Sequence, residues 1–217
     1  MCVVAISEGT ALSLKEVGKA SPDSARRPGH AVAFAASAGG LSALTHVLSS
    51  LPADFAAPVL VVQHIDPNHR SWLAEILRRR VALEVEQAHG GEELDAGKIY
   101  LAPPDRHMVV GEDGRLSLSD VARVQYVRPS ADLLFASLAG AWGKGAIAVV
   151  LSGTGRDGAD GVRAIKQHGG VVIAQDEASA EFFGMPEAAQ QTGAVDRVLP
   201  LDEIAPALVK LIQGGTA

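Results

Sequence analysis

Three side chains that could carry acyl-transfer chemistry follow three separate apolar runs of the sequence. Ser37 comes after "AVAFAA", His64 after "PVLVVQ", and Asp157 shortly after "AIAVVLS". A hydroxyl, an imidazole and a carboxylate in one crevice are the parts of a triad: the serine attacks, the histidine takes its proton, and the carboxylate orients the imidazole. We therefore interpret Ser37 as a nucleophile, His64 as a general base and Asp157 as its orienting acid.

Each of the three residues also has a structural alternative. A serine before two glycines is more often a turn residue or a helix N-cap, and a histidine after a strand is more often structural than catalytic. Asp157 would suit the N-cap of a helix that begins near Gly158. Catalysis is favoured by the common position of the three residues, because the carboxyl ends of parallel strands open onto one edge of the sheet, where ligands bind.

Metal and cofactor sites are weakly indicated. His64, Asp66 and His69 in "HIDPNHR" could ligate a metal, but no third histidine motif nearby completes a zinc set, so we expect no metal. "SAGG" and "GTGRDG" lack the G-x-G-x-x-G spacing with an acidic residue about 20 positions further on, so we expect no dinucleotide cofactor. The sequence leads us to expect surface or loop positions for three more histidines: His89, His107 and His168.

The elements that must position these residues alternate between strands and helices. The predicted strands are 31–36, 58–63, 98–102, 146–152 and 170–175. The predicted helices are about 40–50, 70–80, 131–141, 158–168, 186–191 and 202–213. Several strands are apolar on both faces, as in a buried parallel sheet, and "MVVGEDGRLSL" is typical of a hairpin around Asp113 and Gly114. The sequence therefore predicts an α/β fold: a three-layer, doubly wound, mostly parallel sheet with helices on both faces and an antiparallel β-hairpin extension.

Composition limits the class of protein. Of the 217 residues 47% are hydrophobic and 20% charged, and the net charge of -6 argues against a nucleic-acid partner. No apolar run approaches the roughly 18 residues of a spanning helix, so we expect no membrane insertion. The single cysteine, Cys2, excludes an internal disulfide and fits a reducing, cytoplasmic compartment. The stretch from Ser7 to His30 has few large apolar residues and ends in "SPDSARRPG", so we predict a flexible tail over residues 1–29 and a catalytic domain over 30–217.

Six segments appear in the order found in one known family: "AASAGG", "VVQHI", "YLAPPDRHM", "RPSADLLFASLA", "VVLSGTGRDGADG" and "QDEASAEFFGMPEAA". Over about residues 30–213 the chain resembles the catalytic domain of the CheB-type chemotaxis protein-glutamate methylesterases. The resemblance implies the same roles for Ser37, His64 and Asp157, and an oxyanion hole formed by the backbone amides of Ala38 and Thr154. Thr154 stands where the family often has methionine.

The resemblance also implies a function and partners. Members of the family hydrolyse glutamate γ-methyl esters on the cytoplasmic helices of methyl-accepting chemotaxis receptors, and many deamidate receptor glutamines. Many also carry an N-terminal receiver domain, which this sequence does not show. We therefore expect either constitutive activity or control by a separate phosphorylated regulator. The competing hypothesis is a catalytically silent homologue that acts as a receptor- or scaffold-binding module.

Overall fold

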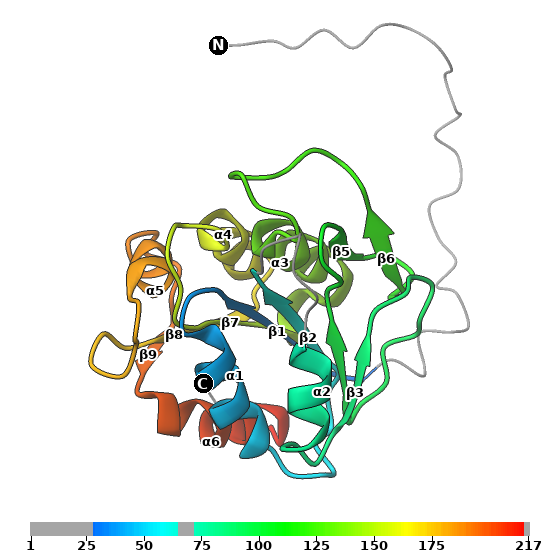
Figure 1. Cartoon of the computed structure of the whole chain (residues 1–217), viewed down its shortest axis with the longest axis horizontal. Coiled ribbons are helices and arrows are strands. Elements are labelled where there is room, and N and C mark those ends of the chain that lie inside the picture. The colour runs from blue at the N-terminus through cyan, green and yellow to red at the C-terminus, as the bar shows by residue number, and fades with distance from the viewer. Residues whose placement is uncertain (1–27, 65–71, 215–217) are drawn as a thin grey trace, which may run out of the picture.

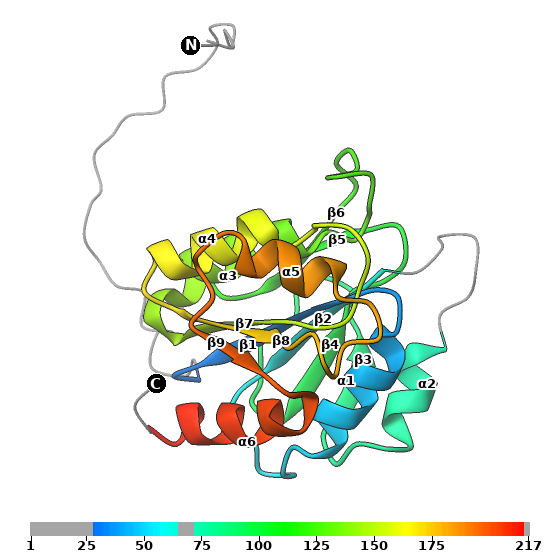
Figure 2. The ribbon, with the colours of Figure 1, turned by 90° about the vertical axis from the view of Figure 1, so that its left-hand side faces the viewer.

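A sheet of seven parallel strands lies between two layers of helices in the computed structural model, which describes residues 28–64 and 72–214 (Figures 1 and 2). The strands of this sheet are β1 (Ala31–Ala36), β2 (Val59–Gln63), β3 (Glu84–Gln87), β4 (Lys98–Leu101), β7 (Ala146–Val150), β8 (Val171–Gln175) and β9 (Arg197–Leu199). The α-helices are α1 (Gly40–Ser49), α2 (Leu73–Arg78), α3 (Ala131–Trp142), α4 (Ala159–Gln167), α5 (Gly184–Gln190) and α6 (Leu201–Ile212). The α/β class predicted from the sequence is confirmed.

The order of the strands creates a crevice at the centre of the sheet. The order is β3-β4-β2-β1-β7-β8-β9. The chain moves from β1 toward β2 and β4 on one side, and later from β7 toward β8 and β9 on the other. The direction of winding therefore reverses between β1 and β7, and the carboxyl ends of strands at such a switch point form the usual ligand site of an open α/β sheet.

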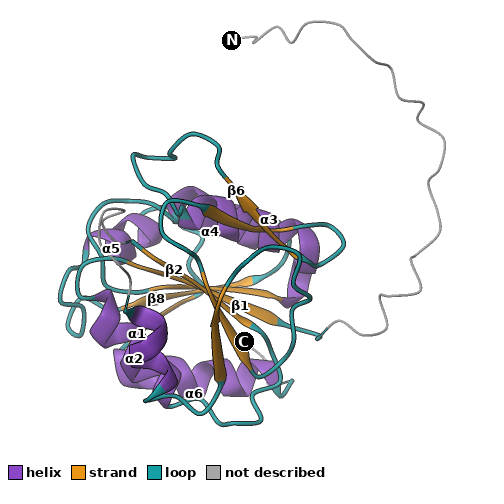
Figure 3. Ribbon diagram, turned by 45° about the vertical axis from the view of Figure 1, so that its right-hand side comes forward, coloured by secondary structure: helices purple, strands orange, loops and turns teal. Residues whose placement is uncertain are grey.

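The strands are buried on both faces because successive side chains of a strand point to opposite sides. In β1, Val32 and Phe34 pack in one core with apolar residues of α1, α2 and α6. Ala33 and Ala35 pack in the other core with apolar residues of α3, α4 and α5. Figure 3 shows the resulting arrangement, with helices on both sides of the strands. Two-sided burial explains why β1 reads as a continuous apolar run.

The predicted hairpin is confirmed as β5 (His107–Val110) and β6 (Leu116–Ser119), which pair antiparallel. The turn between them contains Gly114 at φ 81°, a conformation that favours glycine. The hairpin forms a two-stranded sheet of its own and adds no strand to the seven-stranded sheet. Its apolar side, including Met108 and Leu116, joins the core under α3.

All five predicted strands and all six predicted helices are present, most with small differences at their ends. The helix predicted over 70–80 is α2, Leu73–Arg78, and its first two predicted residues lie outside the described residues. The sequence did not predict β3 and β9, which lie at the two edges of the sheet. The predicted tail over residues 1–29 falls almost entirely outside the described residues, so the predicted division into tail and domain stays a prediction. Within the described part of the chain, no helix has the length and hydropathy that crossing a bilayer requires.

Candidate active site

Ser37 is the first residue after β1 and lies in the turn that leads into α1. Its amide donates to the carbonyl of Ser152, 3.0 Å away, and its own carbonyl accepts from the amide of Gly40 at 2.9 Å. Gly39 is the N-cap of α1 at φ 71°, and a Cβ there would lie 2.7 Å from the Ser152 hydroxyl oxygen. This crowding explains the glycine after Ala38. The Ser37 side chain does not cap α1, which leaves the hydroxyl available for other contacts.

His64 is brought beside Ser37 by the register of the central strands. Ala36 of β1 pairs with Gln63 of β2, and the amide of His64 donates to the carbonyl of Ala36 at 2.9 Å. Ser37 and His64 therefore occupy neighbouring positions immediately beyond the paired strands. The Gln63 side chain joins their backbones, because its Nε2 donates to the Ser37 carbonyl at 2.7 Å and to the His64 carbonyl at 3.1 Å.

His64 is paired with Asp157 across 93 residues of sequence. The distance from His64 Nε2 to Asp157 Oδ2 is 2.8 Å, and the side chains are only 12% and 3% exposed. Because Asp157 occupies Nε2, Nδ1 is the nitrogen left to accept a proton from another group. Sequence reasoning placed these two residues at one edge of the sheet, and the structure brings them into direct contact.

Asp157 is surrounded by hydrogen-bond donors at the beginning of α3. Its Oδ1 accepts from the Ser130 hydroxyl at 2.7 Å and from the Asp132 amide at 3.2 Å, and its Oδ2 also accepts from the Ala131 amide at 2.6 Å. Burial would raise the pKa of Asp157, but the hydrogen bonds from His64, Ala131 and Ser130 outweigh burial and lower the pKa below its usual range. Asp157 is therefore an ionised partner for His64.

The alternative reading of Asp157 as the N-cap of the following helix is wrong. The N-cap of α4 is Gly158, and its amide donates to Asp132 Oδ1 at 2.9 Å. The amides of Asp160 and Gly161 donate to the same oxygen at 3.0 and 2.8 Å. Asp132, from the first turn of α3, therefore accepts the free amides of α4, while Asp157 accepts those of α3.

Asp132 is a second buried carboxyl beside the first, and sequence reasoning missed it. Burial is the main cause that raises its pKa, to about 6, and the neighbouring charge of Asp157 adds to the effect. Its Oδ2 accepts from Gln125 Nε2 at 2.7 Å. The motif "RPSAD" signalled these residues only through the family resemblance, because Asp132 lies 25 positions before Asp157 and on another element.

The expectation of a surface or loop position for His107 is wrong. His107 begins β5 and is fully buried, and its Nδ1 accepts the amide of Ser130 at 3.1 Å. Ser130 is equally buried. Its hydroxyl donates to Asp157 and does not cap α3. His107 thus fixes the backbone of Ser130, and the Ser130 hydroxyl holds the Asp157 carboxylate that is hydrogen-bonded to His64.

The backbone amides of Ala38 and Thr154, which the family resemblance predicts to form an oxyanion hole, lie in the loops that follow β1 and β7. Within residues 28–64 and 72–214, neither amide donates to a protein acceptor. The Ala38 carbonyl accepts from the Ser152 hydroxyl at 2.9 Å, which fixes the turn after Ser37. A Cβ on Gly153 would lie 2.9 Å from Ser37 Cβ, so the chain leading to Thr154 passes directly beside the serine.

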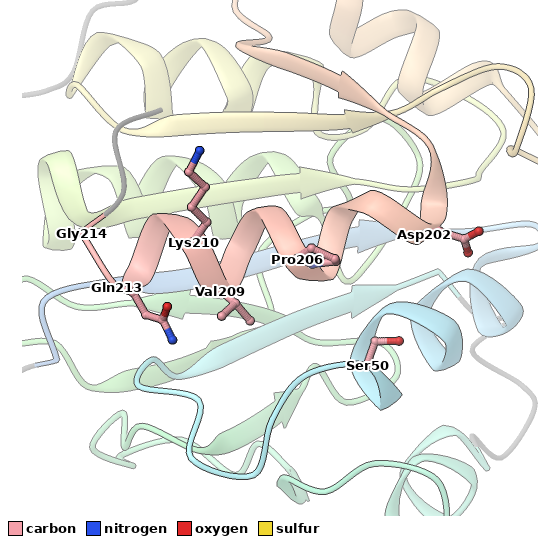
Figure 4. A pocket seen from close by; sticks show the side chains of 7 residues that line it. All are labelled: Ser50, Asp202, Pro206, Val209, Lys210, Gln213 and Gly214. Carbon is pink, nitrogen blue, oxygen red and sulfur yellow. The ribbon is translucent and has the colours of Figure 1, made fainter.

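A cavity of about 520 Å³ opens at this edge of the sheet. Its lining includes His64, Asp157 and Thr154 from the predicted site, together with Tyr126 and Arg156. A second cavity, of about 770 Å³, lies along α6, in the helix layer that also contains α1 and α2 (Figure 4). No predicted site residue lines it. It is lined by Ser50, Asp202, Pro206, Val209, Lys210, Gln213 and Gly214. His64 and Asp157 thus line the first cavity, whereas Ser37 is not among its lining residues.

The metal alternative concerns residues that the structure only partly describes. Asp66 and His69 lie outside the described residues, and His64 is paired with Asp157. Elsewhere in 28–64 and 72–214, no three potential histidine, cysteine or carboxylate ligands gather around one point.

Comparison with known proteins gives one consistent family. Residues 32–208 match the model of the CheB methylesterase family. The chain is similar to protein-glutamate methylesterase/protein-glutamine glutaminase 2 of Anaeromyxobacter dehalogenans, with 48% identity over 91% of this chain and 58% of the relative. A relative from Myxococcus xanthus, protein-glutamate methylesterase/protein-glutamine glutaminase 4, is 44% identical over 87% of this chain and 53% of its own length. The chain therefore spans about half of the length of these curated relatives.

A solved structure extends the similarity to the fold. The catalytic domain of Thermotoga maritima CheB methylesterase superimposes with a TM-score of 0.81 and 35% identity, and the match covers 84% of this chain and 98% of that domain. The shared fold is the mostly parallel seven-stranded sheet with its helices and the separate two-stranded sheet.

Proposed function

The chain belongs to the CheB methylesterase family, and from that premise we propose that it hydrolyses glutamate γ-methyl esters in methyl-accepting chemotaxis receptors. Glutamine deamidation is the proposed second reaction, because both reactions pass through a tetrahedral oxyanion at a side-chain carbonyl. The observation that carries the proposal is the hydrogen bond of 2.8 Å between the half-buried His64 and the buried Asp157, with Ser37 in the neighbouring position of the sheet edge. The proposed compartment is the cytoplasm.

The proposed reaction begins with attack by Ser37 Oγ on the ester carbonyl carbon. His64 Nδ1 accepts the hydroxyl proton, and Asp157 stabilises the resulting imidazolium through Nε2. The carbonyl oxygen becomes an oxyanion that accepts hydrogen bonds from the free amides of Ala38 and Thr154. One such donor typically stabilises the transition state by about 2.7–4 kcal/mol. When the tetrahedral intermediate collapses, the C–O bond to the methoxy group breaks and Nδ1 returns the proton, so that methanol leaves.

The second half of the reaction releases the enzyme. Water attacks the acyl-enzyme carbonyl while His64 Nδ1 takes a proton from it, and the bond to Ser37 Oγ breaks as that proton passes to the serine. The products are free Ser37 and a glutamate side chain. With a glutamine substrate the same steps release ammonia in place of methanol.

The contact between Ser37 and His64 stays a prediction. In this structure the Ser37 hydroxyl makes no hydrogen bond to a described residue, and the proposed mechanism requires one to Nδ1 of His64. Catalytic hydrogen bonds are often long without substrate and shorten in the substrate complex. The Gln63 side chain joins the backbones of Ser37 and His64, which supports a position of the two residues next to each other.

Methanol release from a methylated receptor fragment tests the proposal. A variant Ser37→Ala should lose at least about a thousandfold in kcat, since removal of the nucleophile from subtilisin costs about a millionfold. Ser42→Ala is the matched control, because Ser42 is an exposed serine five residues further along the same turn and helix. Equal methanol release by Ser37→Ala and the wild type would exclude the mechanism. Receptor binding without any release by the wild type would favour the binding-module hypothesis.

A further inference from the structure

Tyr126 occupies a backbone conformation that a bulky side chain rarely adopts. Gln125 and Tyr126 have φ values of 47° and 69°. The amides of Val124 and Val127 each donate to the other residue's carbonyl, at 3.1 and 2.9 Å, and these bonds close a two-residue turn. Turns with positive φ at both central residues usually contain asparagine and glycine. A tyrosine in the second position is a true outlier, and such strain is found at functional sites.

The Tyr126 ring has no packing role that would explain this conformation. Tyr126 is 94% exposed, whereas the other tyrosine, Tyr100, is fully buried and bonded through its hydroxyl. Aromatic residues are only 4% of the sequence, so few are available to be placed on the surface. The core therefore gains nothing from a ring at this position.

The surrounding loop holds the turn in place. Gln125 is half-buried and donates to Asp132, which in turn accepts hydrogen bonds from the free amides of α4. At the base of the loop, Arg128 donates to the carbonyls of Asp120 and Val121 and to the carboxylate of Asp105. The turn is thus fixed to the same elements that position Asp157.

The turn holds Tyr126 at the rim of the candidate active site. Tyr126 lines the cavity of about 520 Å³ that His64, Asp157 and Thr154 also line. A protein segment bound at His64 would therefore reach Tyr126 at the rim of the same cavity.

We propose that Tyr126 is a substrate-binding residue that packs against the polypeptide flanking the scissile glutamyl ester. This inference rests on the proposed function and deepens it by assigning recognition of the protein chain to a residue outside the triad. Tyrosine suits the role because its rigid ring offers a large contact area and loses little side-chain entropy on binding. The partner is the protein segment on either side of the esterified glutamate.

Binding to an inactive background tests the proposal without requiring turnover. Ser37→Ala and the double variant Ser37→Ala/Tyr126→Gly are titrated with a methylated cytoplasmic fragment of a chemoreceptor. We expect Tyr126→Gly to weaken binding about tenfold, as for a central aromatic contact. Tyr126→Phe keeps the ring and should bind within about threefold of its parent. Val198→Ala, which shortens an exposed apolar side chain on the distant edge strand β9, is the matched control.

Stability separates this role from a structural one. Glycine relieves the left-handed strain, so Tyr126→Gly should not lower the thermal midpoint, although a structural residue would. With active protein, the ratio of kcat/KM for the receptor fragment to that for a small ester should fall about tenfold, mainly through KM. Equal affinities of Ser37→Ala and Ser37→Ala/Tyr126→Gly, or no receptor binding by either, would overturn the inference. The proposed chemistry is tested separately, by comparing methanol release from the wild type and from Ser37→Ala.

Discussion

The side-chain amide of Gln63 lies 2.7 Å from the carbonyl oxygen of Ser37. The same nitrogen donates to the carbonyl of His64, so one amide group joins the backbones of the proposed nucleophile and base. In a planar trans peptide the N–H points away from the C=O. By fixing the Ser37 carbonyl, Gln63 therefore also fixes the direction of the Ala38 amide, the proposed oxyanion donor.

We predict that Gln63→Glu lowers kcat by about ten- to a hundredfold, less than direct removal of an oxyanion donor. Glutamate keeps the shape of the side chain but places a carboxylate oxygen against the two carbonyls, which repels both. Gln63→Leu removes the hydrogen bonds without adding charge and should lose kcat in the same direction. Steady-state methanol release gives kcat and KM, and circular dichroism verifies folding. A wild-type kcat in a folded Gln63→Leu protein would contradict this role.

We predict that Gly153 cannot be replaced without loss of activity, because it lies very close to the proposed nucleophile. A methyl group there would lie 2.9 Å from Ser37 Cβ and would also strike the Met185 sulfur. Gly153→Ala should therefore lower kcat by about a hundredfold, the cost of a misplacement near 1 Å. The double variant Gly153→Ala/Met185→Ala removes the clash with Met185 and keeps the one with Ser37. Wild-type kcat in the double variant would show that Met185, not Ser37, caused the loss.

Asp157→Asn should reduce both activity and stability. Among the described residues, the four hydrogen-bond partners of the Asp157 oxygens are all donors, so an amide nitrogen in place of either oxygen would face an N–H or O–H group. The corresponding change in a serine protease triad lowers kcat about 10⁴-fold, and we expect a similar loss. Activity is measured per folded molecule, at a temperature below the lowered midpoint. Full activity in the folded variant would remove Asp157 from the mechanism.

The parts of the fold that the sequence predicted well are those with continuous burial. β1 and β7 are apolar on both faces, so their amino-acid sequences alone predict buried strands. β3 (EVEQ) and β9 (RVL) are short edge strands, each with one exposed side chain, Glu84 and Val198, and no buried run marked them. An edge strand is defined by its neighbour rather than by its own composition.

The residues of the candidate site also fall into those that the sequence could predict and those that it could not. Ser37 and His64 could be predicted because each directly follows a central strand, and strand ends meet at one edge. His107 could not, since its burial depends on the amide of Ser130, 23 residues further along the chain. Asp132 was missed for the same reason, because its three amide donors belong to a different helix.

The raised pKa of Asp132 predicts a specific dependence of stability on pH. The pKa is about 6 in the folded protein and 3.8 in its ordinary state, with burial as the main cause. Between these values the folded state binds more protons than the unfolded state, so this group's contribution lowers the free energy of unfolding as pH rises. Asp132→Asn cannot titrate and should lack that contribution, and Gln125, whose Oε1 is buried without a partner among the described residues, can turn its amide to accept from the new nitrogen.

Urea unfolding of the wild type and Asp132→Asn at fixed ionic strength, from pH 4 to 8, measures the difference. The free energy of unfolding of the wild type relative to the variant should fall between about pH 4 and 6 and stay constant at higher pH. Asp157 titrates with the opposite sign, because its pKa is lowered, but it is present in both proteins and its effect largely cancels in the difference. Parallel stability curves across this range would show that Asp132 does not take up a proton on folding, and that its three amide donors keep it ionised despite burial.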